Sequence, residues 1–226
     1  MINFNKLTST KLIVALIFTL LMIGCGDGST TPSEPITYHL YDDGQFNPGY
    51  QISFSLTGRS SVGAFFTGTV SITATRDQAL YAGEPVIPVE TYMRLTETNS
   101  GNSTSTVSTE YFNPYNFEPV LMELEGVLYT PTDISVMPDT AEIGDFGELT
   151  TYSGIDGSTI TGTWRLEDAG SGLADIVQQI YYSGGALDFN TTSKIRIDET
   201  GNPSGYSQEI YYPSSGVRVY LSGGRV

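Results

Sequence analysis

The chain has 226 residues and a formal net charge of −15, because 25 Asp and Glu outweigh 10 Lys and Arg. A chain this acidic repels nucleic acid and anionic lipid headgroups, which excludes nucleic-acid binding and argues against electrostatic docking to a membrane surface. The content of 25 Gly, 15 Tyr and 10 Phe is typical of β-sheet and turns rather than helix.

The chain begins with a predicted export signal. Lys6 and Lys11 are the only charged residues before Cys25, and an apolar run from Leu12 to Ile23 follows them. This run is shorter than the about 20 apolar residues that a membrane-spanning helix needs. A basic segment, a short apolar core and a small residue before a cleavage site together describe a signal that is removed after export.

The run ends in Met22-Ile23-Gly24-Cys25, which resembles the lipobox of bacterial lipoprotein precursors, although Met22 stands where that family prefers Leu. The resemblance covers residues 1–25 only. It implies that Cys25 carries a diacylglycerol anchor, that the chain is cut between Gly24 and Cys25, and that an acyl chain such as palmitate modifies the new amino group. Two or three acyl chains anchor a protein stably, because each buried methylene contributes ~0.8 kcal/mol.

Cys25 is also the only cysteine in the chain, so it cannot form an internal disulfide. An unused thiol in an oxidising compartment needs a reason, and acylation supplies one. Two other interpretations stay open from the sequence. One is an ordinary thiol behind a secretory signal, and the other is an uncleaved membrane helix, which the short apolar run disfavours.

The predicted cleavage divides the chain into three parts. Residues 1–24 are the signal peptide, residues 25–35 are the acylated cysteine and a polar linker, and residues 36–226 form a single β-rich domain. The mature chain has 202 residues (226 − 24) and a charge of −17, from 8 cations and 25 carboxylates. In lipoproteins of enteric bacteria, an Asp directly after the cysteine retains the protein in the inner membrane. Gly26 holds that position here, so the resemblance favours the outer membrane of the cell envelope.

From Ile36 onward, apolar residues recur at every second position, which predicts strands with one buried and one wet face. The clearest runs are Ile52/Phe54/Leu56, Val70/Ile72/Ala74, Val89/Met93/Leu95, Ile195/Ile197 and Val217/Val219/Leu221. Short turns rich in Gly, Asn and Pro lie between the runs, so neighbouring strands are expected to pair as antiparallel hairpins. The predicted fold is all-β, an antiparallel meander of about ten to fourteen strands that forms a sandwich or a closed or half-open barrel.

Two features of the domain have alternative interpretations. Four apolar residues between Gly172 and Gly184 have helical spacing, whereas their β-branched side chains and Tyr181-Tyr182 suit a strand over residues 172–183, which we favour. Three internal resemblances occur in the same order and would divide the domain into similar halves, 36–125 and 126–226. They pair Thr67–Val70 with Thr161–Trp164, Met93–Thr98 with Ile195–Thr200, and Tyr111–Pro114 with Tyr211–Pro213.

The sequence offers few catalytic groups. His39 is the only histidine and lies in a predicted strand, so a histidine-based zinc site and a Cys–His nucleophile both lack a second member. No glycine-rich phosphate loop joins a strand to a helix. We therefore expect no enzyme activity and assign no catalytic residue. A glycosidase-type carboxylate pair stays open, because its separation is set in space rather than in sequence.

Carboxylates are densest at Asp139, Glu142 and Asp145, whose oxygens are the candidate ligands for a metal ion. Ca²⁺ takes about six to eight oxygen ligands, and it is the only cofactor that the sequence suggests. The spacing matches no known calcium loop, so a solvated turn is the favoured interpretation.

Tyr111, Phe112, Tyr115 and Phe117 gather around one turn and are the candidate ligand-binding residues. Exposed rings in a row could stack on sugars or line a groove, whereas buried rings would only pack against the sheet. Successive side chains of a strand point to opposite faces, so an adjacent tyrosine pair puts one ring on each face. The chain has two such pairs, Tyr181-Tyr182 and Tyr211-Tyr212.

Three roles are compatible with these features. The first is a non-catalytic binding or structural β-domain, held at the membrane by its acyl chains, with an envelope protein or a glycan as partner. The second is a carrier of an apolar ligand, such as a lipid or a lipoprotein, which requires an apolar cavity in a half-open barrel. The third is a glycan-active enzyme, which requires two carboxylates in a cleft. We favour the first, because a catalytic set is missing from the sequence.

Overall fold

The computed structural model describes residues 36–42, 44–75, 79–184 and 189–226, and it is all-β over these residues. Cys25 and the linker 25–35 lie outside the described residues. The strands are β1 (Thr37–His39), β2 (Gln51–Ser60), β3 (Phe65–Ala74), β4 (Ala79–Tyr81), β5 (Glu84–Glu97), β6 (Ser103–Phe112), β7 (Pro119–Leu124), β8 (Val127–Asp133), β9 (Thr140–Glu142), β10 (Phe146–Gly154), β11 (Thr159–Gly170), β12 (Leu173–Ser183), β13 (Phe189–Ile197), β14 (Pro203–Tyr212) and β15 (Val217–Arg225). The predicted all-β antiparallel meander is confirmed, and residues 172–183 are a strand as favoured.

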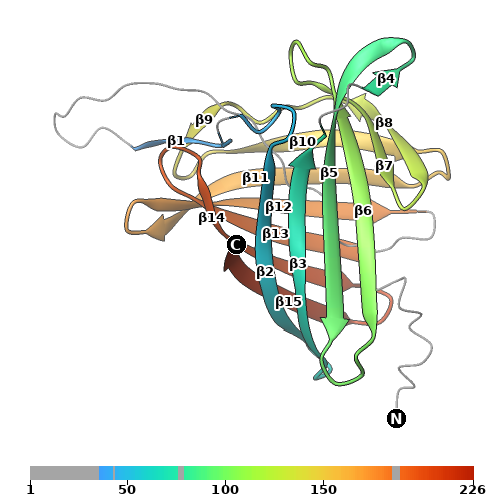
Figure 1. Ribbon diagram of the computed structural model, residues 1–226, viewed down its shortest axis with the longest axis vertical. Coiled ribbons are helices and arrows are strands. Elements are labelled where there is room, and N and C mark those ends of the chain that lie inside the picture. The colour runs from blue at the N-terminus through green and yellow to red at the C-terminus, as the bar shows by residue number, and fades with distance from the viewer. Residues whose placement is uncertain (1–35, 43, 76–78, 185–188) are drawn as a thin grey trace.

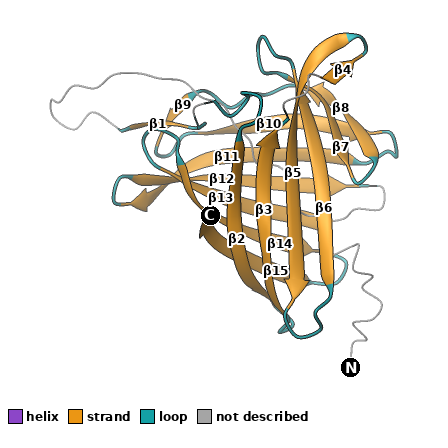
Figure 2. Cartoon of the chain, viewed as in Figure 1, coloured by secondary structure: helices purple, strands orange, loops and turns teal. Residues whose placement is uncertain are grey.

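Twelve of these strands form a closed ring (Figures 1 and 2). Following the chain, β2, β3, β5 to β8 and β10 to β15 each pair antiparallel with the next, and β15 returns to pair with β2. We call this last ladder, between Ser60 and Phe54 of β2 and Val219 and Arg225 of β15, the seam. Because the seam joins the first and last strands, the barrel is closed rather than half-open and leaves no free edge in the ring.

The ring is flattened. Figure 1 shows β2, β3, β5 and β6 along one side, with β10 to β14 crossing behind them at a steep angle. Large inward-facing side chains fill the space between the two layers. Those with less than 2% of their surface exposed include Phe54, Met93, Leu95, Tyr129, Tyr152 and Phe189. Trp164 is also buried, as expected for a core residue.

Elements outside the ring cover its ends. β1 and β9 form a separate two-stranded sheet, and the segment after β1 buries Leu40, Tyr41 and Phe46 in the core. The His39 amide donates a 3.1 Å hydrogen bond to the Glu199 carbonyl, which fixes this segment to the β13–β14 turn. β4 pairs with the first residues of β5, before β5 joins the ring.

The internal resemblances join strands with different neighbours. They relate β3 to β11, β5 to β13 and β6 to β14. β12 lies between β11 and β13, whereas β3 pairs directly with β5. Duplication of the two halves therefore stays a prediction.

Two glycines allow the seam to form. A Cβ atom on Gly223 would overlap the carbonyl oxygen of Ser55, and one on Gly58 would overlap the carbonyl oxygen of Tyr220. Both glycines occupy inward-facing positions of the seam, where backbone of the partner strand comes within the space that a Cβ atom would need. The strands can approach this closely because no side chain separates the backbones there.

Gly223→Ala should lower the free energy of unfolding by about 2 to 3 kcal/mol, because the new methyl group must displace backbone of the partner strand. The neighbouring Gly224 is the matched control, since the nearest atom to a Cβ there is the Ser204 carbonyl oxygen at 4.0 Å. Gly224→Ala should change stability by less than about 1 kcal/mol. Urea unfolding followed by Trp164 fluorescence measures both, and equal effects would show that the strands do not approach this closely at Gly223.

Candidate functional site

A large hollow lies on the outside of the barrel, across the seam. It has a volume of about 580 Å³ and extends over the outer faces of β13, β14, β15 and β2 to the start of β3. A second hollow of about 240 Å³ adjoins it and shares Lys194, Ser207 and Ser222 with it. We call the two together the seam trough.

Strand register builds the trough from two adjacent rows of outward-facing residues. In the first row, Lys194, Ser207, Ser222 and Thr57 are direct partners on β13, β14, β15 and β2. In the second row, Glu209, Tyr220, Arg59 and Phe65 are direct partners on β14, β15, β2 and β3. Short hydroxyl side chains therefore form most of the first row, and longer charged and aromatic side chains form the second.

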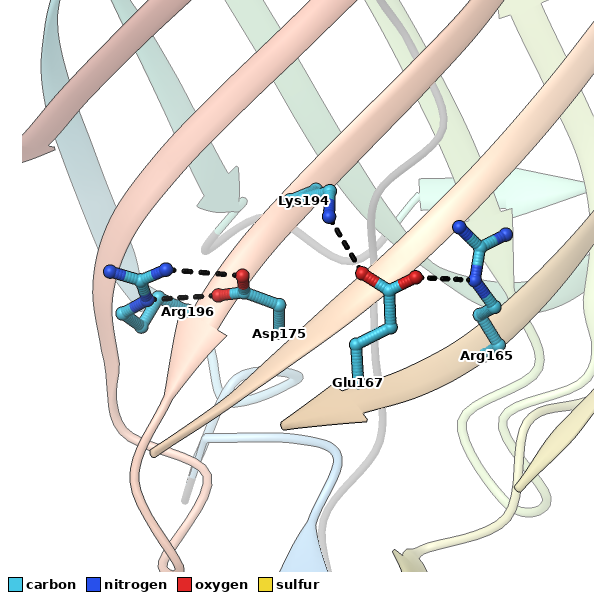
Figure 3. A network of polar contacts seen from close by, with 5 residues as sticks. All are labelled: Arg165, Glu167, Asp175, Lys194 and Arg196. Atoms are coloured by element: carbon cyan, nitrogen blue, oxygen red, sulfur yellow. Dashed lines mark hydrogen bonds and ion pairs between the residues drawn. The ribbon is translucent and has the colours of Figure 1, made fainter. Parts of the chain in front are cut away.

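A charged network borders the trough on the β11–β13 side (Figure 3). Glu167 accepts hydrogen bonds from Lys194 Nζ at 2.6 Å and from Arg165 Nε at 2.7 Å. Asp175 accepts two from Arg196, at 2.9 Å from Nε and 3.1 Å from Nη2. Three cations thus bind two carboxylates, Glu167 and Asp175, which are direct partners on β11 and β12.

The network keeps Glu167 ionised. Hydrogen bonds from Lys194 and then from Arg165 lower the pKa of the Glu167 carboxyl. Hydrogen bonding to Asp175 likewise raises the pKa of Arg196. A general acid of a glycosidase needs a raised pKa, so Glu167 is poorly suited to that role. The side chains are also partly exposed, so these ion pairs contribute little to stability.

Arg218, beside the trough, and Arg59, in its lining, differ in their partners. Arg218 forms an ion pair with Glu209, and its guanidinium lies 4.3 Å from the centre of the Tyr211 ring. Arg59 is exposed, and no ion pair engages it within the part of the chain that the structure describes. Alternation alone places Arg59 on the wet face of its strand, but no local pattern marks it as a site residue, because only the seam brings it beside Tyr220.

The three predicted metal ligands do not converge. Asp139 lies before β9, where its carbonyl oxygen accepts a hydrogen bond from Leu40. Glu142 and Asp145 share one turn, in which the Asp145 carboxylate accepts the Glu142 amide at 2.9 Å. Among the described residues, no group of three or more His, Cys, Asp and Glu side chains is arranged to hold a metal ion. The Ca²⁺ site stays a prediction.

The four predicted ligand-binding aromatics separate into two pairs. Phe112 and Phe117 both pack on Phe46, with ring centres 5.1 and 4.6 Å apart. Tyr111 points outward from β6, and Tyr115 is 84% exposed at the turn. The turn therefore presents one free ring rather than a row. The two tyrosine pairs do split across the sheet as expected, since Tyr182 and Tyr212 are buried and their neighbours point outward.

A carboxyl group with a raised pKa lies inside the barrel. Glu110 points inward from β6 and accepts a hydrogen bond from the Tyr152 hydroxyl on β10, which is not adjacent to β6 in the ring. Burial raises the pKa of Glu110 to about 7, although the Tyr152 hydrogen bond acts in the opposite direction. Sequence reasoning missed this pair, because nothing in the local pattern of β6 marks Glu110 as facing a tyrosine across the barrel.

No protein-family model matches this chain, and no curated protein sequence matches it significantly. No helix among the described residues is long and apolar enough to cross a membrane. The fold and the trough are therefore the structural basis for assigning a role.

Glu110 should make the barrel less stable as the pH rises. Its pKa is higher in the folded state than the ordinary value of 4.5, so the folded state binds the proton more tightly. The contribution of Glu110 to the free energy of unfolding is therefore greatest below pH about 4.5. It falls as the pH rises to about 7 and then levels off, and the total loss is at most about 3 kcal/mol.

Urea unfolding at pH 5 and pH 8 measures this effect by comparison with Glu110→Gln, which has no charge to bury. The free energy of unfolding of the variant minus that of the wild type should be larger at pH 8 than at pH 5. Tyr152→Phe is the second variant, because it removes the hydrogen bond that lowers the pKa and should extend the fall to higher pH. A wild type and a Glu110→Gln variant with the same pH dependence would contradict the burial of this charge.

Proposed function

We propose that this protein is a lipid-anchored lipoprotein of the bacterial cell envelope, whose barrel is a non-catalytic binding domain that uses the seam trough. Met22-Ile23-Gly24-Cys25 supports the anchor, as the resemblance to a lipobox implies. The polar trough on the outside of the barrel is the observation that supports binding. In this proposal the acyl chains hold the domain at the outer membrane, and the linker 25–35 separates it from the lipid surface.

The filled interior favours this role over that of an apolar-ligand carrier. The apolar hollow between Leu40, Ile52 and Ile176 has a volume of only about 20 Å³, roughly the space for one water molecule. A carrier would hold its ligand in a cavity of several hundred Å³, about 300 or more. Inward-facing aromatic and aliphatic side chains occupy the corresponding space here.

The charges of the trough favour binding over catalysis. Glu167 and Asp175 are direct partners on adjacent strands, and cations bind both of them. Glu209 likewise binds Arg218. Carboxylates paired in this way beside hydroxyl groups suit recognition of a polar partner, because together they present fixed hydrogen-bond acceptors and donors.

Intact-mass spectrometry of the protein from its native membrane tests the anchor. The mature chain should begin at Cys25 and carry the added mass of two or three acyl chains. Cys25→Ser should lose that mass, and the variant should leave the membrane fraction or keep its signal peptide. A wild-type mass that begins elsewhere and includes no lipid would contradict the proposal, whatever the barrel binds.

A further inference from the structure

We infer that the ligand of the seam trough is a sparsely acidic glycan, a chain of sugar rings that carries a carboxylate at intervals. This inference rests on the proposed binding function and adds the chemical class of the partner. It follows from the charge, the rings, the hydroxyl groups and the shape of the trough.

The trough is a local exception to the charge of the chain. Its lining includes Arg59, Lys194 and Arg196 against Asp175 and Glu209, whereas the whole chain has a net charge of −15. Both lining carboxylates already bind arginine, Asp175 through Arg196 and Glu209 through Arg218. Charges more than about 8 Å apart are largely screened at physiological ionic strength. The excess of cations over carboxylates in the lining therefore decides which ions the trough attracts. Arg59, which lacks an ion-pair partner among the described residues, is the group that would bind a ligand carboxylate.

Aromatic rings stand on both sides of Arg59. Tyr220 is its direct partner on β15 and Phe65 its direct partner on β3, and these side chains are 42% and 55% exposed. Exposed rings offer rigid, apolar contact area at low entropic cost, and a tyrosine adds a hydroxyl group. A sugar ring has an apolar face and a polar rim, so a ring packed here would place a carboxylate near the guanidinium.

Hydroxyl groups form the floor next to these rings. Thr57, Ser207 and Ser222 lie side by side on adjacent strands, and each can donate and accept a hydrogen bond. A row of hydroxyls matches the many hydroxyls of a glycan better than it matches an apolar ligand. The row from β13 to β2 crosses three strand spacings, or about 14 Å, which is long enough for a ligand of several units.

The closed ring disfavours a peptide strand as the occupant. A peptide that binds by strand addition needs a free sheet edge with unpaired backbone groups. The seam pairs β2 with β15 directly beneath the trough, so those backbone groups are already used. Nucleic acid is disfavoured as well, because a single arginine without an ion-pair partner among the described residues cannot neutralise its dense row of phosphates.

Isothermal titration of the mature protein, solubilised in detergent from its native membrane, tests the inference with two probes. The first is a hexasaccharide of alternating glucuronate and N-acetylglucosamine, and the second is the neutral N-acetylglucosamine hexamer. The acidic probe should bind at least about tenfold more tightly, which is the effect expected of one charge-assisted contact. Arg59→Gln should weaken binding of the acidic probe by about tenfold and leave binding of the neutral probe unchanged.

Arg94→Gln is the matched control, because Arg94 is an exposed arginine on the outer face of β5, on another part of the ring. It should leave both affinities unchanged. Ser222→Trp, which fills the exposed floor without touching the core, should abolish binding of both probes. Circular dichroism confirms that each variant folds.

Equal affinity for the two probes, or no loss in Arg59→Gln, would overturn the acidic-glycan inference. Absence of binding by either probe would overturn it too. Neither result bears on the acyl chains at Cys25, so the mass measurement distinguishes failure of the ligand class from failure of the proposed anchored domain. If binding survives Ser222→Trp, the glycan site is elsewhere and the inference fails.

Discussion

The pairing of β2 with β15 is the constraint on which the rest of this structure depends. It joins the two ends of the meander, and hydrogen bonds beyond the ladder extend it at both ends. The Ser61 amide donates to the Arg218 carbonyl at 2.8 Å, and the Val226 amide donates to the Ser53 carbonyl at 3.0 Å. Without this ladder, the sheet would have two open edges and an uncovered apolar face, which favours aggregation. Gly58 and Gly223 make the close approach of the strands sterically feasible.

The seam also determines where the protein can interact with other molecules. A ring of twelve strands could enclose a ligand cavity, but large inward-facing side chains fill this one. The proposed binding surface therefore lies on the outer face. The seam builds that surface, because it places the hydroxyl floor of β14 and β15 beside the arginine and phenylalanine of β2 and β3.

Local features of the sequence predicted much of the fold. Strict alternation predicted that Lys194 and Arg196 face water while Ile195 and Ile197 face the core, and the structure confirms it. The strand at 172–183 follows from its β-branched residues, which outweigh a helical spacing of the same side chains. Such features depend on neighbours within a few residues, so a single sequence contains the information.

The trough could not be predicted in the same way. Arg59 and Tyr220 are direct partners only because the ends of the chain meet, and the ladder of the seam joins residues as far as 171 positions apart (225 − 54). The cluster around Tyr115 shows the same limit of local reasoning. Its rings are close in sequence, but Phe112 and Phe117 turn inward onto Phe46, a residue that no local pattern connects with them. Adjacency along the chain therefore did not predict that these four rings divide between the core and the surface, and their role in ligand binding stays a prediction.

A designed disulfide across the seam tests the closure most directly. Thr57 and Ser222 are direct partners with outward side chains, and such pairs have Cα separations of about 4.5 to 5.5 Å, within the range that a disulfide spans. Thr57→Cys with Ser222→Cys should therefore oxidise completely and stabilise the barrel, in a Cys25→Ser background that removes the native thiol. Thr57→Cys with Thr96→Cys is the control, because Thr67 of β3 separates these positions and the Cα atoms lie about 9 to 10 Å apart. Efficient oxidation of the control pair, or failure of the seam pair to oxidise in the folded protein, would contradict the closed barrel and the trough built on it.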